Sequence, residues 1–414
     1  MVRVAAVSVG LVAALVLSGC SVPRPLPTPT PTASASAETR GDGVLRIGTL
    51  FSMSGDVAGL GAGMVAAVEV AVRDINAAGG VLGRPVETFY RNAGTAAQSR
   101  LETAFADLVS RGIDVVMGPA DAELAARLVP LATDAGVTLI SPATAISPPV
   151  DGVFSLIASA DAQARAILSA IADGGAESVA IISASDASGL AFDRSARAAL
   201  ADLGVQLASA EQLDAATNPA RLAFSVTGSE PDAIILASTS SLAAQNQAVL
   251  TALADRGVVG SDLWLTGPAL VDYSATLVPG RLEGAQGVRG GASLSDAFAL
   301  RLRQSDPAVR VTSFAAETYD AVVLAALAAE LAGDDSGLSI AAHVREASVD
   351  GVPCASFGEC VDVLITQTDV NYEGLSGPVS VTEQGSVADG FLSLYRYTAE
   401  NRADLVGPLV AAGQ

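Results

Sequence analysis

The sequence predicts an α/β fold with two Rossmann-like units, each built around a parallel sheet. Its 414 residues exceed what one hydrophobic core usually accommodates, so about two compact units are expected. Half of the residues are hydrophobic but only 4% are aromatic, which predicts cores made mainly of Ala, Val, Leu and Ile. From residue 44 onward, short apolar strands alternate with amphipathic helices, and that alternation is typical of βαβ units.

The first series of elements runs from residue 44 to residue 144. The expected strands span 44–51, 84–93, 113–120 and 137–144, and the expected helices span 64–80, 96–112 and 123–136. Apolar residues recur at helical spacing in the helices. Gly79 and Gly80 can adopt the left-handed conformation that ends a helix, and Pro85 sets φ before the next strand. This connection belongs on the side of the sheet away from any ligand.

A second series follows the apolar stretch 153–159. The expected strands span 177–185, 204–213, 231–238 and 262–269, and the expected helices span 162–175, 189–204 and 243–257. From about Val288 we expect a long helix at 313–333, a loop with two cysteines and a β-rich end at 376–398. The chain therefore contains two α/β sheets in tandem.

Six loops follow the carboxyl ends of expected strands, at 52–61, 118–123, 141–147, 185–191, 238–244 and 266–273. Ligands of open parallel sheets bind beyond these ends. Two such sheets facing each other make a cleft, so we expect the loops to line a solute site. The glycines at 59–63 resemble a dinucleotide turn, but their spacing is wrong for that fingerprint and favours a turn from loop to helix.

The N-terminus predicts export and a membrane anchor. Arg3 precedes an apolar run at 4–17, and "LSGC" at 17–20 resembles a bacterial lipobox, which implies cleavage before Cys20 and lipidation of its thiol. The alternative is a plain signal peptide with an incidental cysteine. Residues 1–19 are then the signal peptide, and the Pro-, Thr- and Ser-rich residues 20–43 are an extended tether.

The charge and the remaining cysteines narrow the class of protein. A formal net charge of −21 disfavours a nucleic-acid partner, because phosphate binding requires clustered basic residues. In an oxidising, exported setting, Cys354 and Cys360 are expected to form a local disulfide. A metal site would need more ligands, and the single histidine, His343, lies in a separate helical stretch.

Several motifs, in order, resemble the leucine/isoleucine/valine-binding protein family, the type I solute-binding proteins of branched-chain amino-acid and amide ABC transporters. They are "RIGTLFSMSG", "AVRDINAAGGVLGRPVE", "VVMGPA", "GVTLISPAT", "VAIISA", "PDAIILA", "TYDAVVLAALA" and "YEGLSGPVSVTEQG". The resemblance implies two lobes joined by three crossings. Lobe 1 would comprise 44–158 and about 289–377, and lobe 2 would comprise 159–288 and about 378–414.

The resemblance also implies a function. The lobes would close by a hinge around a small-molecule solute, without a cofactor, and a monomer anchored at the extracytoplasmic face would deliver this solute to an ABC transporter permease. Ligand would act by binding the closed form better than the open form.

The family's ligand-binding positions fall on residues that depart from its usual pattern. These expected site residues are Ala120, Asp121, Ala122, Ala143, Thr144, Ala145, Ser188, Thr239, Ala269, Asp272 and Phe314. Ala122 replaces the usual serine, Thr239 falls where the family often has tyrosine, and Ala269 falls at the acid that pairs with an α-ammonium. Because a buried charge without its partner is costly, the pocket favours a bulkier or less charged ligand, or none.

Alternatives follow from these departures. The protein could be a sensory or scaffold protein that keeps the fold with an altered or lost pocket. Asp121 and Asp272 could form an acid–base pair in an exported enzyme, although loop caps and surface charges are commoner roles for such residues. No serine or cysteine nucleophile stands in a recognisable motif around His343. We therefore predict a binding protein without catalysis.

Overall fold

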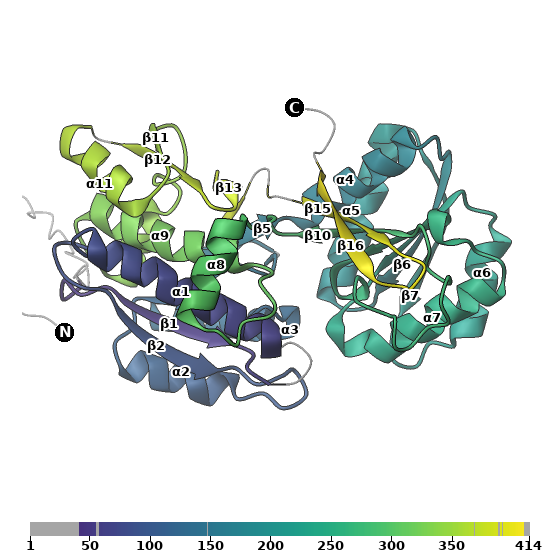
Figure 1. Ribbon diagram of the computed structural model, residues 1–414, viewed down its shortest axis with the longest axis horizontal. Coiled ribbons are helices and arrows are strands. Elements are labelled where there is room, and N and C mark those ends of the chain that lie inside the picture. Colours follow the sequence, from purple (N-terminus) through teal and green to yellow (C-terminus); the bar gives the residue numbers. More distant parts are fainter. Residues whose placement is uncertain are drawn as a thin grey trace, which may run out of the picture. The chain divides into compact units, whose positions relative to one another are not determined.

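The computed structural model describes residues 41–409 apart from 55–57, 147, 368, 388–389 and 391 (Figure 1). The predicted signal peptide, the tether and the lipidation site Cys20 lie outside the described residues. Within them, two separate sheets, the first parallel and the second mainly parallel, carry most of the helices (Figure 1). This arrangement confirms the predicted α/β fold with two lobes.

The first sheet has six strands in the order β14-β5-β4-β3-β1-β2, all of them parallel to their neighbours. Its strands are β1 (Arg46–Phe51), β2 (Glu87–Asn92), β3 (Val115–Met117), β4 (Thr138–Ser141), β5 (Val153–Ala158) and β14 (Ser386–Val387). The four interior strands β5, β4, β3 and β1 are almost wholly buried, as expected for a sheet with helices on both faces.

Two helical layers cover this sheet. One layer packs α2 (Leu101–Ser110) and α3 (Ala122–Ala135) over Leu50, Val116 and Leu139. The other layer packs α1 (Ala58–Ala77) and α9 (Ala315–Ala332) over Ile47, Phe51 and Met117. The remaining elements of this part are α8 (Asp296–Ser305), α10 (Gly337–His343), α11 (Phe357–Thr366) and a small sheet of β11 (Val352–Cys354), β12 (Val370–Gly374) and β13 (Gly377–Pro378).

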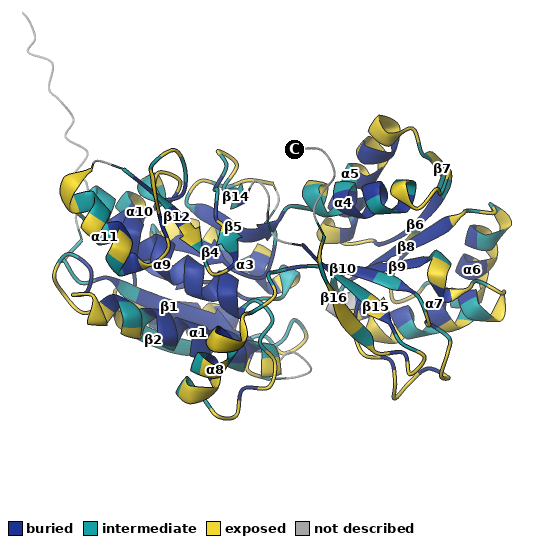
Figure 2. Cartoon of the chain, turned by 45° about the horizontal axis from the view of Figure 1, so that its top comes forward, coloured by how far each residue is buried: buried dark blue, intermediate teal, exposed yellow. Residues whose placement is uncertain are grey.

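Helix α9 is the central helix of this lobe. Every residue from Ala315 to Ala329 is buried (Figure 2), because α1, α10 and α11 contact it on several sides. Helix α1 approaches neighbouring backbone closely through its glycines. A Cβ atom on Gly61 would lie 2.3 Å from the Ser52 carbonyl oxygen, and one on Gly63 would lie 2.2 Å from the Val311 carbonyl oxygen. The glycines at 59–63 therefore serve helix packing.

The second sheet has seven strands in the order β16-β15-β10-β9-β8-β6-β7, with the pairings of β15 antiparallel. Its strands are β6 (Ser178–Ala184), β7 (Gln206–Leu213), β8 (Ala233–Ala237), β9 (Leu263–Thr266), β10 (Gln286–Gly290), β15 (Leu392–Tyr397) and β16 (Ala403–Leu409). Its helices are α4 (Ala160–Asp173), α5 (Ala187–Leu203), α6 (Pro219–Gly228), α7 (Ala243–Asp255) and the short 3-10 turns η2 (Ser240–Leu242), η3 (Gly260–Asp262) and η4 (Gly267–Ala269). Core clusters place α4 and α5 on one face and α6 and α7 on the other.

The structure differs from the sequence-based expectation in several helices and in the return to the second lobe. Helices α6, α8 and α11 were not predicted, and Cys360, expected in a loop, lies in α11. For α6 the start signals are ordinary, since Asn218 caps it and Pro219 begins it. We expected the return to the second lobe at about residue 378. Instead β14, at 386–387, pairs with β5 of the first sheet, and the second sheet resumes only at β15.

The predicted disulfide is present. Cys354 of β11 is bonded to Cys360 of α11, and both residues are buried. The bond therefore fixes α11 against the small third sheet.

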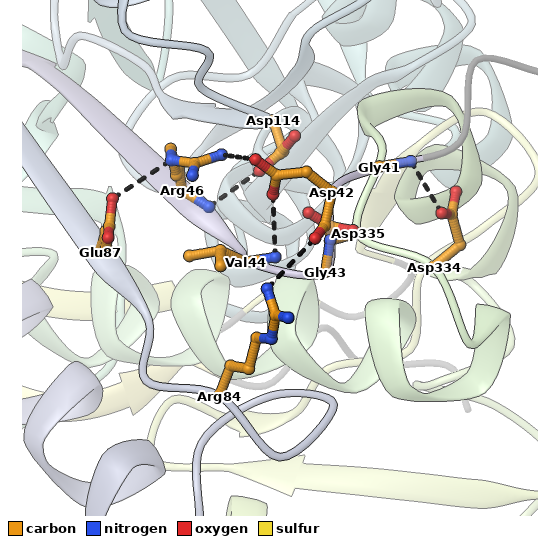
Figure 3. A network of polar contacts seen from close by, with 10 residues as sticks. All are labelled: Gly41, Asp42, Gly43, Val44, Arg46, Arg84, Glu87, Asp114, Asp334 and Asp335. Atoms are coloured by element: carbon orange, nitrogen blue, oxygen red, sulfur yellow. Dashed lines mark hydrogen bonds and ion pairs between the residues drawn. The ribbon is translucent and has the colours of Figure 1, made fainter.

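Charged residues surround the place where the described chain begins (Figure 3). The backbone N–H groups of Gly41 and Gly43 donate to Asp334 and Asp335, each at 2.8 Å. The Arg46 guanidinium pairs with Asp42 at 2.8 Å and with Glu87 at 3.2 Å. These contacts fasten the segment 41–46 to the residues that follow α9 and to the start of β2.

Candidate ligand-binding loops

In the first lobe, Thr144 connects two of the expected loops. Its hydroxyl donates to the Pro119 carbonyl oxygen at 3.2 Å, and its N–H donates to the Ser141 hydroxyl at 3.2 Å. Thr144 and Ala143 are buried, while Ala145 is partly exposed. The structure thus brings the loops after β3 and β4 together, and the Thr144 oxygen keeps lone pairs that can accept a further hydrogen bond.

Asp121 is the N-cap of α3. Its carboxylate accepts the N–H groups of Glu123 at 2.9 Å and Leu124 at 3.0 Å. Ala120 and Ala122 flank it and are partly exposed. The negative charge of the Asp121 carboxylate is therefore directed at the N-terminus of α3, where a carboxylate is favourable.

Phe314 has an unusual backbone at the start of α9. Its φ is 61°, in the left-handed region that a bulky side chain rarely adopts. Its carbonyl oxygen accepts both the N–H and the hydroxyl of Thr318, at 3.0 and 2.6 Å. A Cβ atom on Gly291 would lie 3.3 Å from the Phe314 ring, so the chain that returns from β10 passes next to it. Such strained residues concentrate at functional sites.

In the second lobe, the expected site residues are small and neutral apart from Asp272. Ser188 is exposed in the first turn of α5, which Asp186 caps through the Gly189 N–H at 2.8 Å. Thr239 is partly exposed, and its hydroxyl lies 3.2 Å from the Ser241 hydroxyl. Ala269 is buried, and its carbonyl oxygen accepts the Tyr273 hydroxyl at 2.9 Å.

Asp272 is exposed and lines a shallow cavity of about 230 Å³. Hydrogen bonds from Ser274 hold the pKa of Asp272 below its usual value. Asp121 and Asp272 each accept local backbone N–H groups, from α3 and from Ser274 respectively. These contacts agree with the capping role and lend no support to an acid–base pair.

Two buried carboxyl groups of α9 escaped the sequence analysis. Glu317 is 1% exposed, and its Oε1 accepts the Ala292 N–H at 2.5 Å, while Oε2 has no partner in the described part of the chain. Burial raises the pKa of Glu317 to about 7. Glu317 thus contacts the segment that returns from β10 to the first lobe. The only sequence signal was a pair of acidic residues, Glu317 and Asp320, near the start of a mostly apolar helix.

The second group, Asp320, is fully buried and well satisfied. It accepts the Tyr372 hydroxyl at 2.8 Å and the N–H groups of Leu375 and Ser376 at 2.9 and 2.7 Å. Burial raises its pKa, and these hydrogen bonds oppose the increase. Asp320 therefore holds the turn between β12 and β13 rather than a ligand.

Other kinds of site find no support in the described residues. No three or more His, Cys, Asp or Glu side chains among them are grouped so as to hold a metal ion. Across the same residues, no helix combines the length and the apolar character that a membrane crossing requires.

These observations define a class: a two-lobed α/β protein whose loops at the carboxyl ends of two parallel sheets are small and mostly neutral. Residues 44–367 match the family model described as periplasmic binding protein, so the chain belongs to that family. This confirms the resemblance noted in the sequence. The family consists of solute-binding proteins and not of enzymes, and it implies an extracytoplasmic location.

Solved structures share the fold at low sequence identity. The branched-chain amino-acid binding protein LivJ of Streptococcus pneumoniae, solved with isoleucine, is 19% identical with a TM-score of 0.65, covering 89% of this chain and 99% of LivJ. A solute-binding protein of R. palustris, solved with benzoate, is 17% identical with a TM-score of 0.64, covering 89% and 97%.

A fatty-acid transporter binding protein of Thermomonospora curvata is 15% identical with a TM-score of 0.65, covering 90% of this chain and 95% of its own. A comparison with curated protein sequences found no match. The three structures thus share one fold while their described ligands differ, so the fold alone does not name the solute of this chain.

Proposed function

We propose that this protein is the lipid-anchored, extracytoplasmic solute-binding component of an ABC importer. It captures a small molecule between its two lobes by hinge closure and delivers it to a membrane permease. Family membership over residues 44–367 carries this proposal. The strained Phe314 and the loops joined by Thr144 support a ligand site at the carboxyl ends of the first sheet.

The proposed site comprises the residues expected from the sequence. In the first lobe, Thr144 and the backbone around Ala120 and Ala143 would hold the solute, and Phe314 would contact its apolar part. In the second lobe, Thr239 and Ser188 would supply hydroxyl groups. An α-amino acid is a less favourable solute than an uncharged one, because Ala269 stands where an acid would pair with the ammonium group.

The anchor and the oligomeric state are part of the same proposal. Cleavage before Cys20 and lipidation of its thiol would leave the folded body on a flexible tether, as a monomer. Mass spectrometry of the protein from its native host should find Cys20 at the N-terminus with a diacylglycerol modification. If the mature protein begins at another residue, and Cys20 is either removed or carries no lipid, the alternative of a plain signal peptide with an incidental cysteine is supported.

Native mass spectrometry and a thermal-shift screen test the binding function. The full chain is analysed before and after partial unfolding, and it is screened against amino acids, amides, aromatic acids and fatty acids. A solute present at 100 times its Kd should stabilise the protein by about 2.7 kcal/mol, which is easily measured. Absence of both a bound mass and a shift would favour the sensory or scaffold alternative.

A further inference from the structure

The chain returns from the second lobe to the first across the start of α9. Gly291 and Ala292 form this crossing segment, between β10 of the second sheet and α8 of the first lobe. Gly291 has a φ of 118°, and a Cβ atom on it would lie 3.3 Å from the Phe314 ring and 3.5 Å from Glu317 Oε1. Its carbonyl oxygen accepts the Ser393 hydroxyl of β15 at 2.8 Å. The crossing segment thus packs against α9 on one side and β15 on the other.

Another connection between the lobes lies beside the crossing segment. A Cβ atom on Gly290 would lie 3.5 Å from Ile157 of β5, the strand that leads into α4 of the second lobe. Gln163 of α4 donates to the Ala158 carbonyl oxygen at 2.8 Å in the same connection. Hinge motions are absorbed by a few residues in connections of this kind. A side chain that holds the crossing segment can therefore act on the hinge.

Glu317 is the side chain that holds the crossing segment from the first lobe. It is 1% exposed, its Oε1 accepts the Ala292 N–H at 2.5 Å, and its Oε2 has no partner among the described residues. The N-terminus of α9 favours a carboxylate, but burial outweighs this effect and raises the pKa of Glu317 from 4.5 to about 7. Rising pH over that range therefore favours any arrangement of the chain in which Glu317 is hydrated.

The charged groups of the neighbouring elements do not offset this cost. Asp320, one turn further along α9, raises the pKa of Glu317, and none of the described cations lowers it. The other titratable groups on these elements have partners of their own. They are Asp74, Arg301 and Tyr319, which bond one another, Glu69 and Arg73, which bond Ser305, Arg310, which donates to the Pro307 and Val309 carbonyl oxygens, and Arg289, which donates to the Leu270 carbonyl oxygen and lies over the Tyr395 ring.

We propose that Glu317 is a positioning residue that makes solute binding depend on pH. In its neutral form it holds the crossing segment against Phe314. When it loses its proton to water, the carboxylate becomes hydrated and the crossing segment moves away from Phe314. Phe314 is the apolar contact of the proposed site, so affinity falls as pH rises. The effect on affinity rests on the proposed solute-binding function, whereas the movement of the crossing segment does not.

Hydrogen–deuterium exchange of the full chain tests the movement without any solute. Peptides that contain Ala292 are followed at pH 5.5 and pH 8, and each rate is divided by the intrinsic rate at that pH. Protection in the wild type should fall by about 10-fold or more at pH 8. Glu317→Gln keeps an acceptor for the Ala292 N–H but cannot ionise, so its protection should not change. Strand β8 is the internal reference and should keep its protection.

Calorimetric titration tests the effect on the solute site, with L-isoleucine and benzoate as probes. Wild-type affinity for a probe that binds should be lower by about 10-fold or more at pH 8 than at pH 5.5. Glu317→Gln should keep the higher affinity at both values. Asp114→Asn is the matched control, because burial also raises the pKa of Asp114 to about 7, but this residue lies before β3 at the opposite edge of the sheet. It should leave the pH dependence of the wild type unchanged.

Three results would overturn the proposal. Equal protection of Ala292 at both pH values would show that the carboxylate is satisfied in place, as by an ordered water molecule at Oε2. An equal loss of protection in β8 would indicate general destabilisation. A probe that binds equally well at both pH values would reject the link to the solute site. If neither probe binds, exchange alone decides the movement, and native mass spectrometry decides the proposed function.

Discussion

The two ends of the first sheet differ in their chemistry. At the amino ends of the strands, the Asp114 carboxylate accepts the backbone N–H of Arg46, and the Arg46 guanidinium pairs with Asp42 and Glu87 (Figure 3). At the carboxyl ends, the loops present Ala120, Ala143 and Thr144, and the carboxylate of Asp121 faces its own helix. Charge in this lobe thus fastens the start of the folded chain, whereas the candidate ligand edge remains mostly neutral.

Helix α9 joins the two ends. It starts at Phe314 beside Gly291, and the residues just after it approach the amino end of the sheet, where the Thr138 hydroxyl donates to the Gly337 carbonyl oxygen at 2.6 Å. The first turn of α9 carries Glu317, which is buried beside Ala292. Glu317 is therefore the acidic exception at the otherwise mostly neutral carboxyl edge of the sheet. Substitutions at Glu317, Asp114 and Thr144 test this difference between the two ends of the sheet, and their expected effects on stability decrease in that order.

Glu317→Gln should have the largest effect on stability. The pKa of Glu317 is raised from 4.5 to about 7 in the folded protein, so the folded state binds its proton more tightly than the unfolded state does. The free energy of unfolding therefore falls as pH rises from about 4.5 to about 7, and the penalty persists above that. Gln carries no charge, and at pH 8 it should stabilise the protein by up to about 3 kcal/mol.

Urea unfolding of both proteins at pH 4 and pH 8 measures this effect. The two should differ little at pH 4, because Glu317 is then protonated in the folded state and mostly protonated in the unfolded state. Equal stability at pH 8 would mean that the Glu317 carboxylate has a hydrogen-bonding partner in solution. Glu317 would then not be an uncompensated buried charge at the carboxyl edge of the sheet.

Asp114→Asn should produce a smaller effect of the same sign at the amino end. Burial raises the pKa of Asp114 from 3.8 to about 7, with a smaller opposing effect of the hydrogen bond from the Arg46 N–H at 2.8 Å. The wild-type protein loses stability as pH rises through this range, and the substitution should restore about 2 kcal/mol at pH 8 once partial solvation is considered.

The same urea series at pH 3 and pH 8 tests this prediction, with Asp134→Asn on exposed α3 as the control. The control should behave like the wild type at both values. If Asp114→Asn lowers stability at pH 8, the charges at this end attract more strongly than burial penalises them, and the contrast between the two ends becomes sharper.

Thr144→Val should have the smallest effect on stability and should act on binding. It removes the hydrogen bond to the Pro119 carbonyl oxygen, which is worth about 1 kcal/mol. Thermal unfolding should show this loss, and affinity for any solute found in the screen should fall, since the loops after β3 and β4 are no longer joined. Unchanged affinity would place the ligand away from this loop.

Local patterns in the sequence predicted much of the fold. Helical spacing and apolar runs predicted most strands and helices of both sheets, and Cys354 and Cys360 were predicted to be bonded. Helices α6, α8 and α11 were missed, although Asn218 and Pro219 mark the start of α6. Both the correct predictions and these misses concern signals carried within about ten residues.

The candidate site was predictable only as a set of positions. The sequence placed Asp121 and Thr144 in loops, but it could not say that Asp121 caps α3 or that Thr144 binds the loop after β3. Both facts depend on how neighbouring strands align, since adjacent carboxyl ends meet only once the sheet is assembled.

Local sequence patterns were sufficient to predict the alternation of strands and helices, the loops at the carboxyl ends of the strands and the disulfide. Only the packed structure shows that α9 is buried from Ala315 to Ala329, that Glu317 accepts a hydrogen bond from the segment returning from β10, and that the buried Asn246 amide has no hydrogen-bond partner among the described residues. The two kinds of feature differ in the sequence separation of the residues that produce them. Periodicity and capping act between residues a few positions apart, whereas desolvation and missing hydrogen bonds depend on which distant elements pack against a side chain.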